Sequence, residues 1–545
     1  MNTVHFSEFL NKYSPAAYAF HRAMEHCRLT GAKRLVVDGD RYVIDYDYCS
    51  ERNLCYSNHD KNGPKRIMAL IEDMENFEID FNGATLDCRG IMTPVAILRS
   101  KNIKIKNLTL ENSTTGFLQL RVTAHNADGS VECEYMCGGD NFTLVDGHYY
   151  VKYPYLDALF PLHMNIEYNG KTGEIEYGTH DDTLGIPASR LIFTELGEGK
   201  YLVKGGTRQP PVGNILVISG TRRLGAGFFL SDSENIEIEN VNVHSCYGMG
   251  LIAQMCENIT LRRFNTLRHG VQYYTSDADA THFVNCTGVV LVEDCTFEGQ
   301  LDDALNIHGM YTRIVGKGKR ELLVREMHHQ ALGIRIYRVG DRIQALPPSS
   351  LIPYAEATVK AVEYINEEII RLTLEEDTDG ISVGDDIESV NRAPELIFRG
   401  NTVRNNRARG MLIATRGKAT IENCYFHSSG TAIKFESDGN NWFESGGTTD
   451  VTVRGCKFDR CKHGGWGDAI IECQPRNEIV EGKYFHKKIT VENNEFYMHN
   501  DYLAAFYNVE LIGFDGNKVY GTDGKAANVE ISEDKDRQYY GVRTK

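Results

Sequence analysis

The sequence predicts an all-β protein: a right-handed parallel β-helix with an N-terminal helical cap and two small inserted antiparallel β-barrel-like domains. Short runs in which apolar and polar residues alternate recur along the chain, and this is the period of a β-strand. Several runs lie 23 residues apart, such as those that begin at Ile236 and Ile259. A repeat of about 23 residues that contains several short strands is typical of one coil of a parallel β-helix.

The length of the chain favours the same fold. A chain of 545 residues is too long for one ordinary compact domain, but a solenoid escapes this limit because each coil packs only on its neighbours. Leucine-rich repeats have a similar period, yet their Leu-x-x-Leu-x-Leu-x-x-Asn pattern is absent. A propeller needs about 40 residues for each blade, which is longer than the spacing observed.

The N-terminal segment, up to about residue 33, is predicted to be helical. Phe20, Met24 and Cys27 recur at helical intervals, and Gly31 is a suitable residue to end the helix. A helix at this position would cover the first open coil and protect its edge.

Two strand-rich stretches interrupt the repeat, and we interpret them as inserted β domains. The second insertion follows directly after the candidate catalytic segment, so it is placed to form one wall of a cleft. The predicted organisation is residues 1–117 for the cap and first coils, 118–228 for the first insertion, 229–310 for the central coils with the candidate catalytic residues, 311–393 for the second insertion, and 394–545 for the C-terminal coils and tail.

The composition limits the partners. The net charge is −16, with 75 acidic and 59 basic residues, which argues against a nucleic-acid backbone or an anionic membrane surface and permits a neutral sugar. No stretch approaches the length of a membrane span. The N-terminus lacks the basic start and apolar run of a signal peptide. We therefore expect a cytoplasmic protein, or a secreted one if a leader had been removed.

The cysteines indicate packing rather than cross-linking. Fourteen cysteines in a chain of this length are too few for a disulfide scaffold. Many of them close or follow a strand-like run, where a free cysteine serves as a small buried apolar residue. Cys133 and Cys137 have no second ligand pair of matching spacing, so they indicate a zinc site only weakly.

Three aspartates are the candidate catalytic residues. Asp302 and Asp303 are adjacent, and Asp279 precedes Asp302 by 23 residues, which is one coil. Neighbouring coils would bring the three carboxyl groups together. Clustered carboxyl groups cannot all ionise at neutral pH, so one would keep a proton while the others activate water. An inverting glycosidase needs this combination.

Strand geometry sets a condition on this cluster, and aspartates in such a pattern also have two non-catalytic roles. In a strand, Asp277 and Asp279 would face the same side, whereas Asp302 and Asp303 would face opposite sides unless a bend or bulge lies there. Aspartates also occur in β-helix turns, where they bind the backbone. Clustered carboxylates also bind calcium.

Further polar and aromatic residues are candidates for substrate binding. Trp466 lies in a glycine-rich loop, and a tryptophan ring is a natural platform for the apolar face of a sugar; Trp442 is a second candidate for this role. His308 follows Asp303 closely and could bind a carboxylate or a sugar hydroxyl. The predicted substrate-binding set is His308, Asp277, His282, Arg409, Lys434, Glu436, Trp466 and Glu472.

Three strings of sequence carry a family resemblance: Tyr56-Ser-Asn-His-Asp-Lys-Asn-Gly-Pro-Lys-Arg66, Ser276-Asp-Ala-Asp-Ala-Thr-His-Phe283 and Asp302-Asp-Ala-Leu-Asn-Ile-His-Gly309. In these strings and their order, nearly the whole chain resembles the α-1,3-galactosidases of glycoside hydrolase family 110, which carry two inserted β domains. The resemblance implies an inverting exo-enzyme that needs no metal or organic cofactor. It also implies that Asp279, Asp302 and Asp303 are catalytic.

The substrate that the resemblance implies is an oligosaccharide or glycan with terminal α-galactose, such as the blood group B determinant or a linear α-1,3-galactosyl end. By analogy with the inverting polygalacturonases, which are also β-helices, Asp302 would be the acid, and Asp279 and Asp303 would hold the water. No nucleic-acid or membrane partner is expected. Association into a homo-oligomer through the flanks of the solenoid is compatible with the fold.

Two other functions are compatible with the sequence. The chain could be another β-helix carbohydrate-active enzyme, either a polygalacturonase-like hydrolase or a polysaccharide lyase. A lyase that acts on uronates needs calcium or a strong base and a cationic cleft, and its unsaturated product absorbs ultraviolet light. The chain could also be a non-catalytic glycan-binding solenoid, in which Asp303→Asn would leave binding intact and no sugar would be released.

Overall fold

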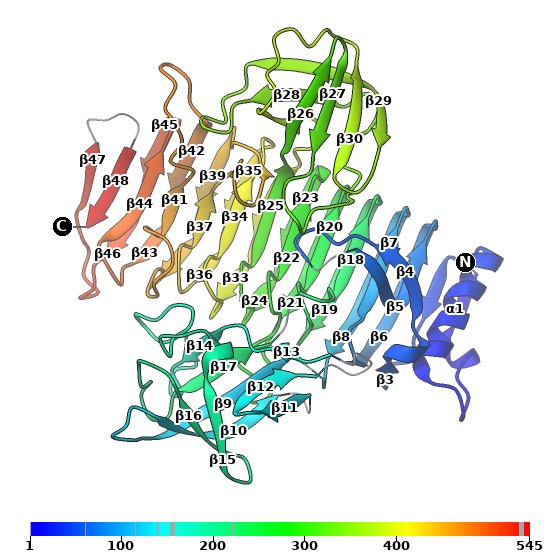
Figure 1. The fold of residues 1–545 in the computed structure, drawn as a ribbon, viewed down its shortest axis with the longest axis vertical. Coiled ribbons are helices and arrows are strands. Elements are labelled where there is room, and N and C mark those ends of the chain that lie inside the picture. Colours follow the sequence, from blue (N-terminus) through cyan, green and yellow to red (C-terminus); the bar gives the residue numbers. More distant parts are fainter. Residues whose placement is uncertain are drawn as a thin grey trace.

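The parallel β-helix is confirmed by a computed structural model, which describes residues 2–59, 62–114, 116–138, 141–152, 158–220, 223–533 and 539–544. Among these residues, two long sheets of 19 and 14 strands run along the molecule (Figure 1). The N-terminus and the C-terminus lie at opposite ends of the solenoid. None of the helices in the described part of the chain has both the length and the apolar character of a membrane span.

The predicted repeat corresponds to stacked coils. In the 19-stranded sheet, β19 (Glu234–Val243) pairs in parallel with β21 (Glu257–Thr266), and Ile236 lies opposite Ile259. The 14-stranded sheet stacks β18 (Phe228–Ser231), β20 (Leu251–Gln254), β22 (Thr281–Val284), β25 (Leu305–Met310), β34 (Met411–Ala414), β37 (Ile433–Phe435) and β41 (Ile471–Cys473) in parallel. This second sheet carries the residues of the site described below.

Apolar side chains fill the space between the sheets. Phe398, Phe426, Phe458 and Phe496 form a column in which successive ring centroids are 6.3, 5.1 and 4.6 Å apart. Burial of each such ring stabilises the fold by about 1.5–3 kcal/mol. All fourteen cysteines are free, and twelve of them are buried, as the packing interpretation predicts.

Asparagines keep the turns of the coils aligned. Asn235 and Asn258 adopt the left-handed conformation, with φ of 54° and 55°, which asparagine tolerates better than most residues. The side-chain amide of Asn258 donates to Oδ1 of Asn235 at 3.0 Å, and Asn235 donates in the same way to Asn102 at 2.8 Å. The ladder holds neighbouring coils in one register.

The N-terminal cap is shorter than predicted. Helix α1 (Ala16–Thr30) buries Phe20, Met24 and Cys27 and ends at Gly31, whose φ is 65°. The prediction of helix is wrong for the first residues, because β1 (Thr3–His5) pairs in parallel with β2 (Arg34–Val36) and extends the sheet instead. At the other end of the solenoid, β48 (Tyr539–Thr544) pairs antiparallel with β44 (Tyr502–Tyr507).

The first insertion contains only antiparallel pairs among its described strands. Its six-stranded sheet has the order β14 (Asn165–Tyr168), β17 (Ile215–Ser219), β9 (Phe117–His125), β10 (Val131–Gly138), β16 (Lys200–Lys204) and β15 (Ile192–Gly197), beside a three-stranded sheet of β11 (Phe142–Val145), β12 (His148–Val151) and β13 (Phe160–Pro161). The first and last long strands, β9 and β17, pair with each other.

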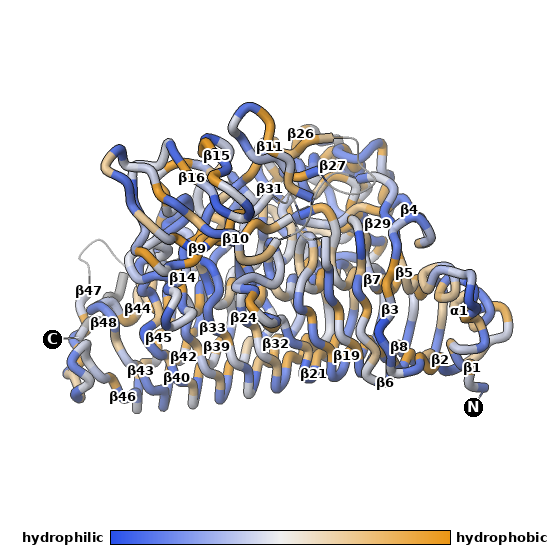
Figure 2. Tube along the Cα trace, turned by 90° about the horizontal axis from the view of Figure 1, so that it is seen from below, coloured by the Kyte–Doolittle hydropathy of each residue, from blue (hydrophilic) through white to orange (hydrophobic). Residues whose placement is uncertain are grey.

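The second insertion is a closed barrel. Its strands, in order around the barrel, are β26 (Thr312–Gly318), β27 (Glu321–Arg325), β30 (Ile369–Leu374), β29 (Ala355–Tyr364), β28 (Arg342–Leu346) and β31 (Asp386–Ser389). The first and last strands, β26 and β31, again pair with each other. Figure 2 shows both insertions on the same side of the solenoid, opposite the row of strands β6, β21 and β40.

Candidate active site

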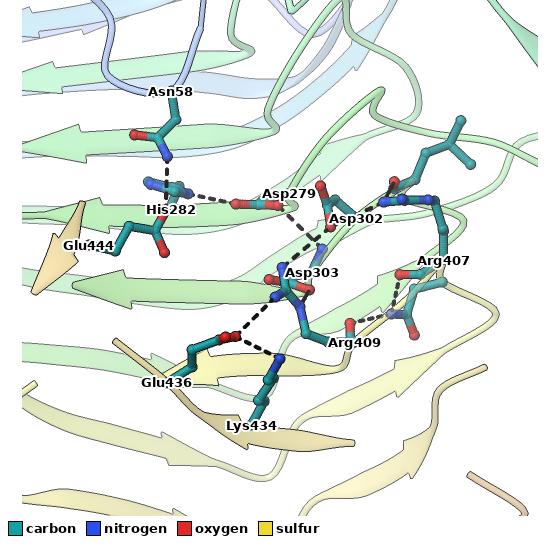
Figure 3. A network of polar contacts seen from close by, with 12 residues as sticks. Asn58, Asp279, His282, Asp302, Asp303, Arg407, Arg409, Lys434, Glu436 and Glu444 are labelled. Atoms are coloured by element: carbon teal, nitrogen blue, oxygen red, sulfur yellow. Dashed lines mark hydrogen bonds and ion pairs between the residues drawn. The ribbon is translucent and has the colours of Figure 1, made fainter. Parts of the chain in front are cut away.

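A cavity of about 1130 Å³ lies where the two insertions meet the solenoid. The first insertion contributes His163 and Met164 to its lining, and the second contributes His329 and Gln330. The solenoid contributes charged side chains from several successive coils, which Figure 3 shows converging from neighbouring strands. A space of this size can hold more than a single sugar ring.

The three aspartates lie on two neighbouring coils, as predicted. Strands β22 and β25 pair with Thr281 opposite Leu305, so Asp279 is level with Asp303. One oxygen atom from each of Asp279, Asp302 and Asp303 can be chosen such that all three lie within 4.8 Å of one another. The expectation that Asp277 and Asp279 lie in one strand is wrong, because both residues lie in the turn before β22.

Asp302 and Asp303 also lie in a turn and not in a strand, so their positions do not depend on a β-bulge. Both residues precede β25. Asp302 lines the cavity together with Asp279, whereas Asp303 is fully buried and does not line it. The backbone N–H of Asp303 donates to Oδ1 of Asp279 at 3.3 Å. Two carboxyl groups can therefore meet a substrate, and the third lies behind them.

Arginines balance the buried negative charge. Arg223 Nη2 donates to Oδ2 of Asp302 at 2.9 Å, and Arg407 Nη1 lies 3.4 Å from Oδ1 of Asp302. Arg409 Nε donates to Oδ1 of Asp303 at 2.9 Å. Among the described residues, Oδ2 of Asp303 is buried and has no hydrogen-bond partner. Arg409 Nη2 also lies 3.9 Å from Oδ1 of Asp302, so three guanidinium groups surround Asp302 and one pairs with Asp303.

The cluster keeps a proton at neutral pH. Burial, together with the negative charge of Asp302, raises the pKa of Asp279 to about 8. Burial also raises the pKa of Asp303 well above its usual range, and the guanidinium of Arg409 opposes this shift. A site with both a protonated acid and an ionised base has the components of general acid–base catalysis.

Two histidines continue the network behind Asp279. His282 Nδ1 is 2.6 Å from Oδ2 of Asp279, and His282 Nε2 is 2.9 Å from Nε2 of His308. Glu444 Oε1 lies 3.5 Å from the same nitrogen of His308 and accepts a hydrogen bond from the Asn58 amide at 3.0 Å. Figure 3 shows Asn58, Glu444, His282 and Asp279 in this sequence.

A second network forms the wall below Asp303. Lys434 Nζ lies 2.7 Å from Oε2 of Glu436 and 3.6 Å from Oε1 of Glu472. Glu472 also accepts from the backbone N–H groups of Asp468 and Ala469, which close the glycine-rich loop. These contacts fix three charged groups whose side chains line the cavity.

Each tryptophan lies beside an arginine that contacts Asp302. The guanidinium of Arg407 is 6.0 Å from the ring centroid of Trp466, and that of Arg223 is 6.0 Å from Trp442. Such cation–π contacts hold the arginine side chains in place. Trp466 and Trp442 therefore help to fix the two arginines that contact the carboxylate of Asp302.

Most of the predicted substrate-binding residues line the cavity, and one does not. The residues that line it are Asp277, His282, Arg409, Lys434, Glu436, Trp466 and Glu472. His308 is buried behind His282 and contacts that histidine, so direct binding of a sugar by His308 is not supported. Asp277 accepts a hydrogen bond from the Ser219 hydroxyl of the first insertion.

Several described residues of the site are absent from the predicted set, and four of them are polar residues close to the histidines and aspartates. Asn58, Arg223, Asn306 and Glu444 all line the cavity. Asn58 and Asn306 lie inside strings that carry the family resemblance, so those strings contained a signal for them. Arg223 lies in a loop, and Glu444 lies in the two-residue strand β38 (Glu444–Ser445), which pairs antiparallel with β25. Neither residue lies in a motif, and only the folded chain brings them to the aspartates.

The electrostatics of the site disfavour a cation between the aspartates. Their oxygen atoms are close enough to share an ion, and hard cations prefer such ligands. However, the guanidinium groups of Arg223, Arg407 and Arg409 already lie within 4.0 Å of these carboxylates. The facing Nε2 atoms of His282 and His308 leave no space for an ion between them.

A parallel β-helix that brings clustered, partly protonated carboxyl groups to a sugar-sized cavity has the groups that hydrolysis of a glycosidic bond needs. Alpha-1,3-galactosidase B of Parabacteroides distasonis is 31% identical over 536 residues, which cover 92% of this chain and 84% of that protein. The relative of the same name from Phocaeicola vulgatus is 32% identical and covers 88% and 84%. The chain belongs to the α-1,3-galactosidase family, glycoside hydrolase family 110, and is a glycoside hydrolase.

Two further comparisons concern the barrel and the solenoid. The family model described as GLAA-B beta-barrel domain II matches residues 321–405, most of which form the second insertion. Among solved structures, the chain is similar to a mannuronan C-5 epimerase A-module of Azotobacter vinelandii (9% identity, TM-score 0.37, 95% of this chain and 98% of that chain). It is also similar to a family 28 exopolygalacturonase of Yersinia enterocolitica (9% identity, TM-score 0.35, 96% of this chain and 79% of that chain).

Proposed function

We propose that the protein is an inverting exo-α-1,3-galactosidase that releases terminal α-1,3-linked galactose from blood group B-type or linear α-galactosyl glycans. The observation that carries this proposal is the meeting of Asp279, Asp302 and Asp303 beside one cavity, with oxygen atoms within 4.8 Å and a proton retained among them. The relatives named alpha-1,3-galactosidase supply the sugar and the linkage.

The insertions support action at chain ends. They stand over the solenoid on the same side (Figure 2) and both contribute to the lining of the cavity. Walls of this kind favour the entry of a terminal sugar over the passage of a long polysaccharide along the solenoid. The terminal galactose would lie against Asp279 and Asp302, and the remaining glycan would extend outwards between the two insertions.

The chemistry divides between the two carboxyl groups that line the cavity. One of Asp279 and Asp302 donates a proton to the glycosidic oxygen, and the other takes a proton from the attacking water. Asp303 positions its neighbours without contacting the substrate: its backbone N–H donates to Asp279, and its side chain accepts from Arg409.

The test of this proposal combines substrate choice with stereochemistry. We expect free galactose from a blood group B trisaccharide or from linear α-1,3-galactobiose, and proton NMR should show the β-anomer first. The carboxyl oxygens are closer here than the roughly 6.5–9.5 Å usual for inverting enzymes, so the water would approach beside the pair rather than between its members. Early α-galactose would contradict inversion, and no galactose from either substrate would contradict the function.

Trp466 offers a test of substrate stacking. Trp466→Ala should raise KM about three- to tenfold with little change in kcat, because stacking on an aromatic face contributes about 0.5–1.5 kcal/mol. Trp466→Phe is the matched control and should keep most of the affinity. Initial rates measured over a range of substrate concentrations, with a thermal melt to verify folding, check this expectation. An unchanged KM in the alanine variant would remove Trp466 from the binding site.

A further inference from the structure

A chain of hydrogen bonds leads from the cavity to a buried backbone carbonyl. It begins at Oδ2 of Asp279, passes through both ring nitrogens of His282 and then through both ring nitrogens of His308, and ends at the carbonyl oxygen of Gly309. The three contacts measure 2.6, 2.9 and 2.6 Å. His282 and His308 are 1% and 3% exposed, so bulk water does not complete these contacts.

The three contacts need one proton more than two neutral imidazoles and an ionised carboxylate carry. The carbonyl of Gly309 can only accept, so Nδ1 of His308 carries a hydrogen. One hydrogen must lie between the two Nε2 atoms, and another between Nδ1 of His282 and Asp279. Two neutral imidazoles and an ionised carboxylate together carry only two. The three contacts therefore require a third proton, which leaves the group of three residues neutral.

The extra proton has two favourable positions. Burial and the nearby charge of Asp302 favour it on Asp279. At the other end, Glu444 Oε1 lies 3.5 Å from Nε2 of His308, and Asn58 holds this carboxylate in place. Burial raises the pKa of Glu444, but the two imidazoles lower it, and the net result lies below the usual range. Glu444 is thus ionised and can balance a positive charge on His308.

Other groups around the two histidines set the balance between these positions. Burial holds the pKa of His282 well below its usual range, so this ring passes the proton on and does not retain it. His59 is neutral, because burial lowers its pKa to about 3. The charged groups that face the histidines are the carboxylates of Asp302 and Glu444, which attract a proton, and the guanidinium groups of Arg223 and Arg409, which repel it.

We propose that His282 and His308 form a proton relay for Asp279, with Glu444 balancing the charge at its inner end. In the transfer, the Asp279 O–H bond breaks as the His282 Nδ1–H bond forms, and the His282 Nε2–H bond breaks as the His308 Nε2–H bond forms. No other atom moves, and the total charge is unchanged. Asp279 can then change its protonation state within one turnover. This proposal rests on the proposed function of Asp279 as an acid or a base.

His308 is the first residue to test, because it does not line the cavity. In His308→Gln the extra proton loses one of its two positions, so the remaining group binds it less tightly. We expect kcat to fall at least about tenfold, which is less than the loss of an acid or base itself, while KM stays within about twofold. One limb of the profile of kcat/KM against pH should move at least about one unit to lower pH.

His486 provides the matched control. It is also fully buried with both ring nitrogens engaged, by Thr448 and by the carbonyl of Gln474, but it contacts none of the aspartates. His486→Gln should leave both limbs of the pH profile in place. If His308→Gln also leaves both limbs in place, and only the rate falls, His308 is merely structural and the relay is wrong.

Glu444→Gln tests the inner position of the proton. Removal of this negative charge should move the limb to lower pH, because the protonated form loses the carboxylate beside His308. In the relay this effect acts chiefly through His308, so the move should be larger in the wild-type background than in His308→Gln. Equal moves in the two backgrounds overturn the relay.

Nitrogen-15 NMR of protein with labelled histidines tests the relay without any activity. The ring nitrogens of His282 and His308 should change in one shared titration step, and the nitrogens of His486 should not take part in it. Asp279→Asn should abolish the shared step. Independent titration of the two rings would contradict the relay. Failure of the relay is therefore distinguishable from failure of the proposed function, which only the release of galactose measures.

Discussion

Substitution of asparagine for Asp279, Asp302 or Asp303 should lower kcat/KM by at least about a hundredfold, the usual contribution of a positioned acid or base. Asparagine has nearly the same shape, but at residues 279 and 302 it can neither donate nor accept the proton, and at residue 303 it loses the carboxyl group that pairs with Arg409. The control is Asp232→Asn, because Asp232 pairs with Arg338 at the surface, and this variant should retain wild-type turnover. Wild-type turnover in any one of the three variants would remove that aspartate from the mechanism.

Activated substrates divide the roles among these variants. A galactoside with a good leaving group, such as a nitrophenol, needs little help from an acid, so the variant of the acid should recover most of its rate on it. The variant of the base should remain slow on both substrates, because water must still lose a proton. Equal recovery by Asp279→Asn and Asp302→Asn would contradict a division of acid and base between these two residues.

At high pH, where Asp303 ionises, Arg409→Gln should reduce the free energy of unfolding by about 3–5 kcal/mol, because removal of the cation leaves a buried charge uncompensated. Asp303 is fully buried, and Arg409 is its ion-pair partner at 2.9 Å. Denaturant unfolding measures this loss. The loss of stability should be small at low pH, where Asp303 is neutral. It should widen as pH rises, because the carboxyl group ionises freely in the unfolded chain but has no cation beside it in the folded variant.

Arg404→Gln is the matched control for this change. Arg404 is on the same coil and pairs with Glu298 at 3.2 Å, but its side chain is 47% exposed. Exposed pairs contribute about 0–1 kcal/mol, so this variant should remain close to the wild type. A loss from Arg409→Gln as small as that from Arg404→Gln would show that Asp303 does not depend on Arg409 for compensation of its charge.

Sequence reasoning located the aspartates because a β-helix converts a fixed offset in sequence into contact. A separation near 23 residues is one coil, so it places Asp279 beside Asp302 and Asp303 independently of the loops elsewhere in the chain. The same reasoning failed for His308, since the side that a side chain faces depends on where the turn ends and β25 begins. Treating Asp277 and Asp279 as strand residues failed for this reason too.

The sequence repeat could not predict that Arg223 and Glu444 lie at the site. Neither residue lies in a repeated position: Arg223 lies in a loop, and Glu444 lies in the short strand β38, which pairs antiparallel with β25. The charges that set the protonation of Asp279 and Asp302 therefore come from parts of the chain without a repeat. The extra proton among Asp279, His282 and His308 depends on contacts that only coordinates reveal.

The way in which the insertions join the solenoid has a consequence for how such enzymes diversify. Each insertion begins and ends on strands that pair with each other, β9 with β17 and β26 with β31, so its two ends lie side by side between neighbouring coils. An insertion could therefore be replaced or shortened to a hairpin without altering the distance between the catalytic turns. A change of insertion would therefore reshape the walls of the cavity while the spacing of the catalytic turns is kept.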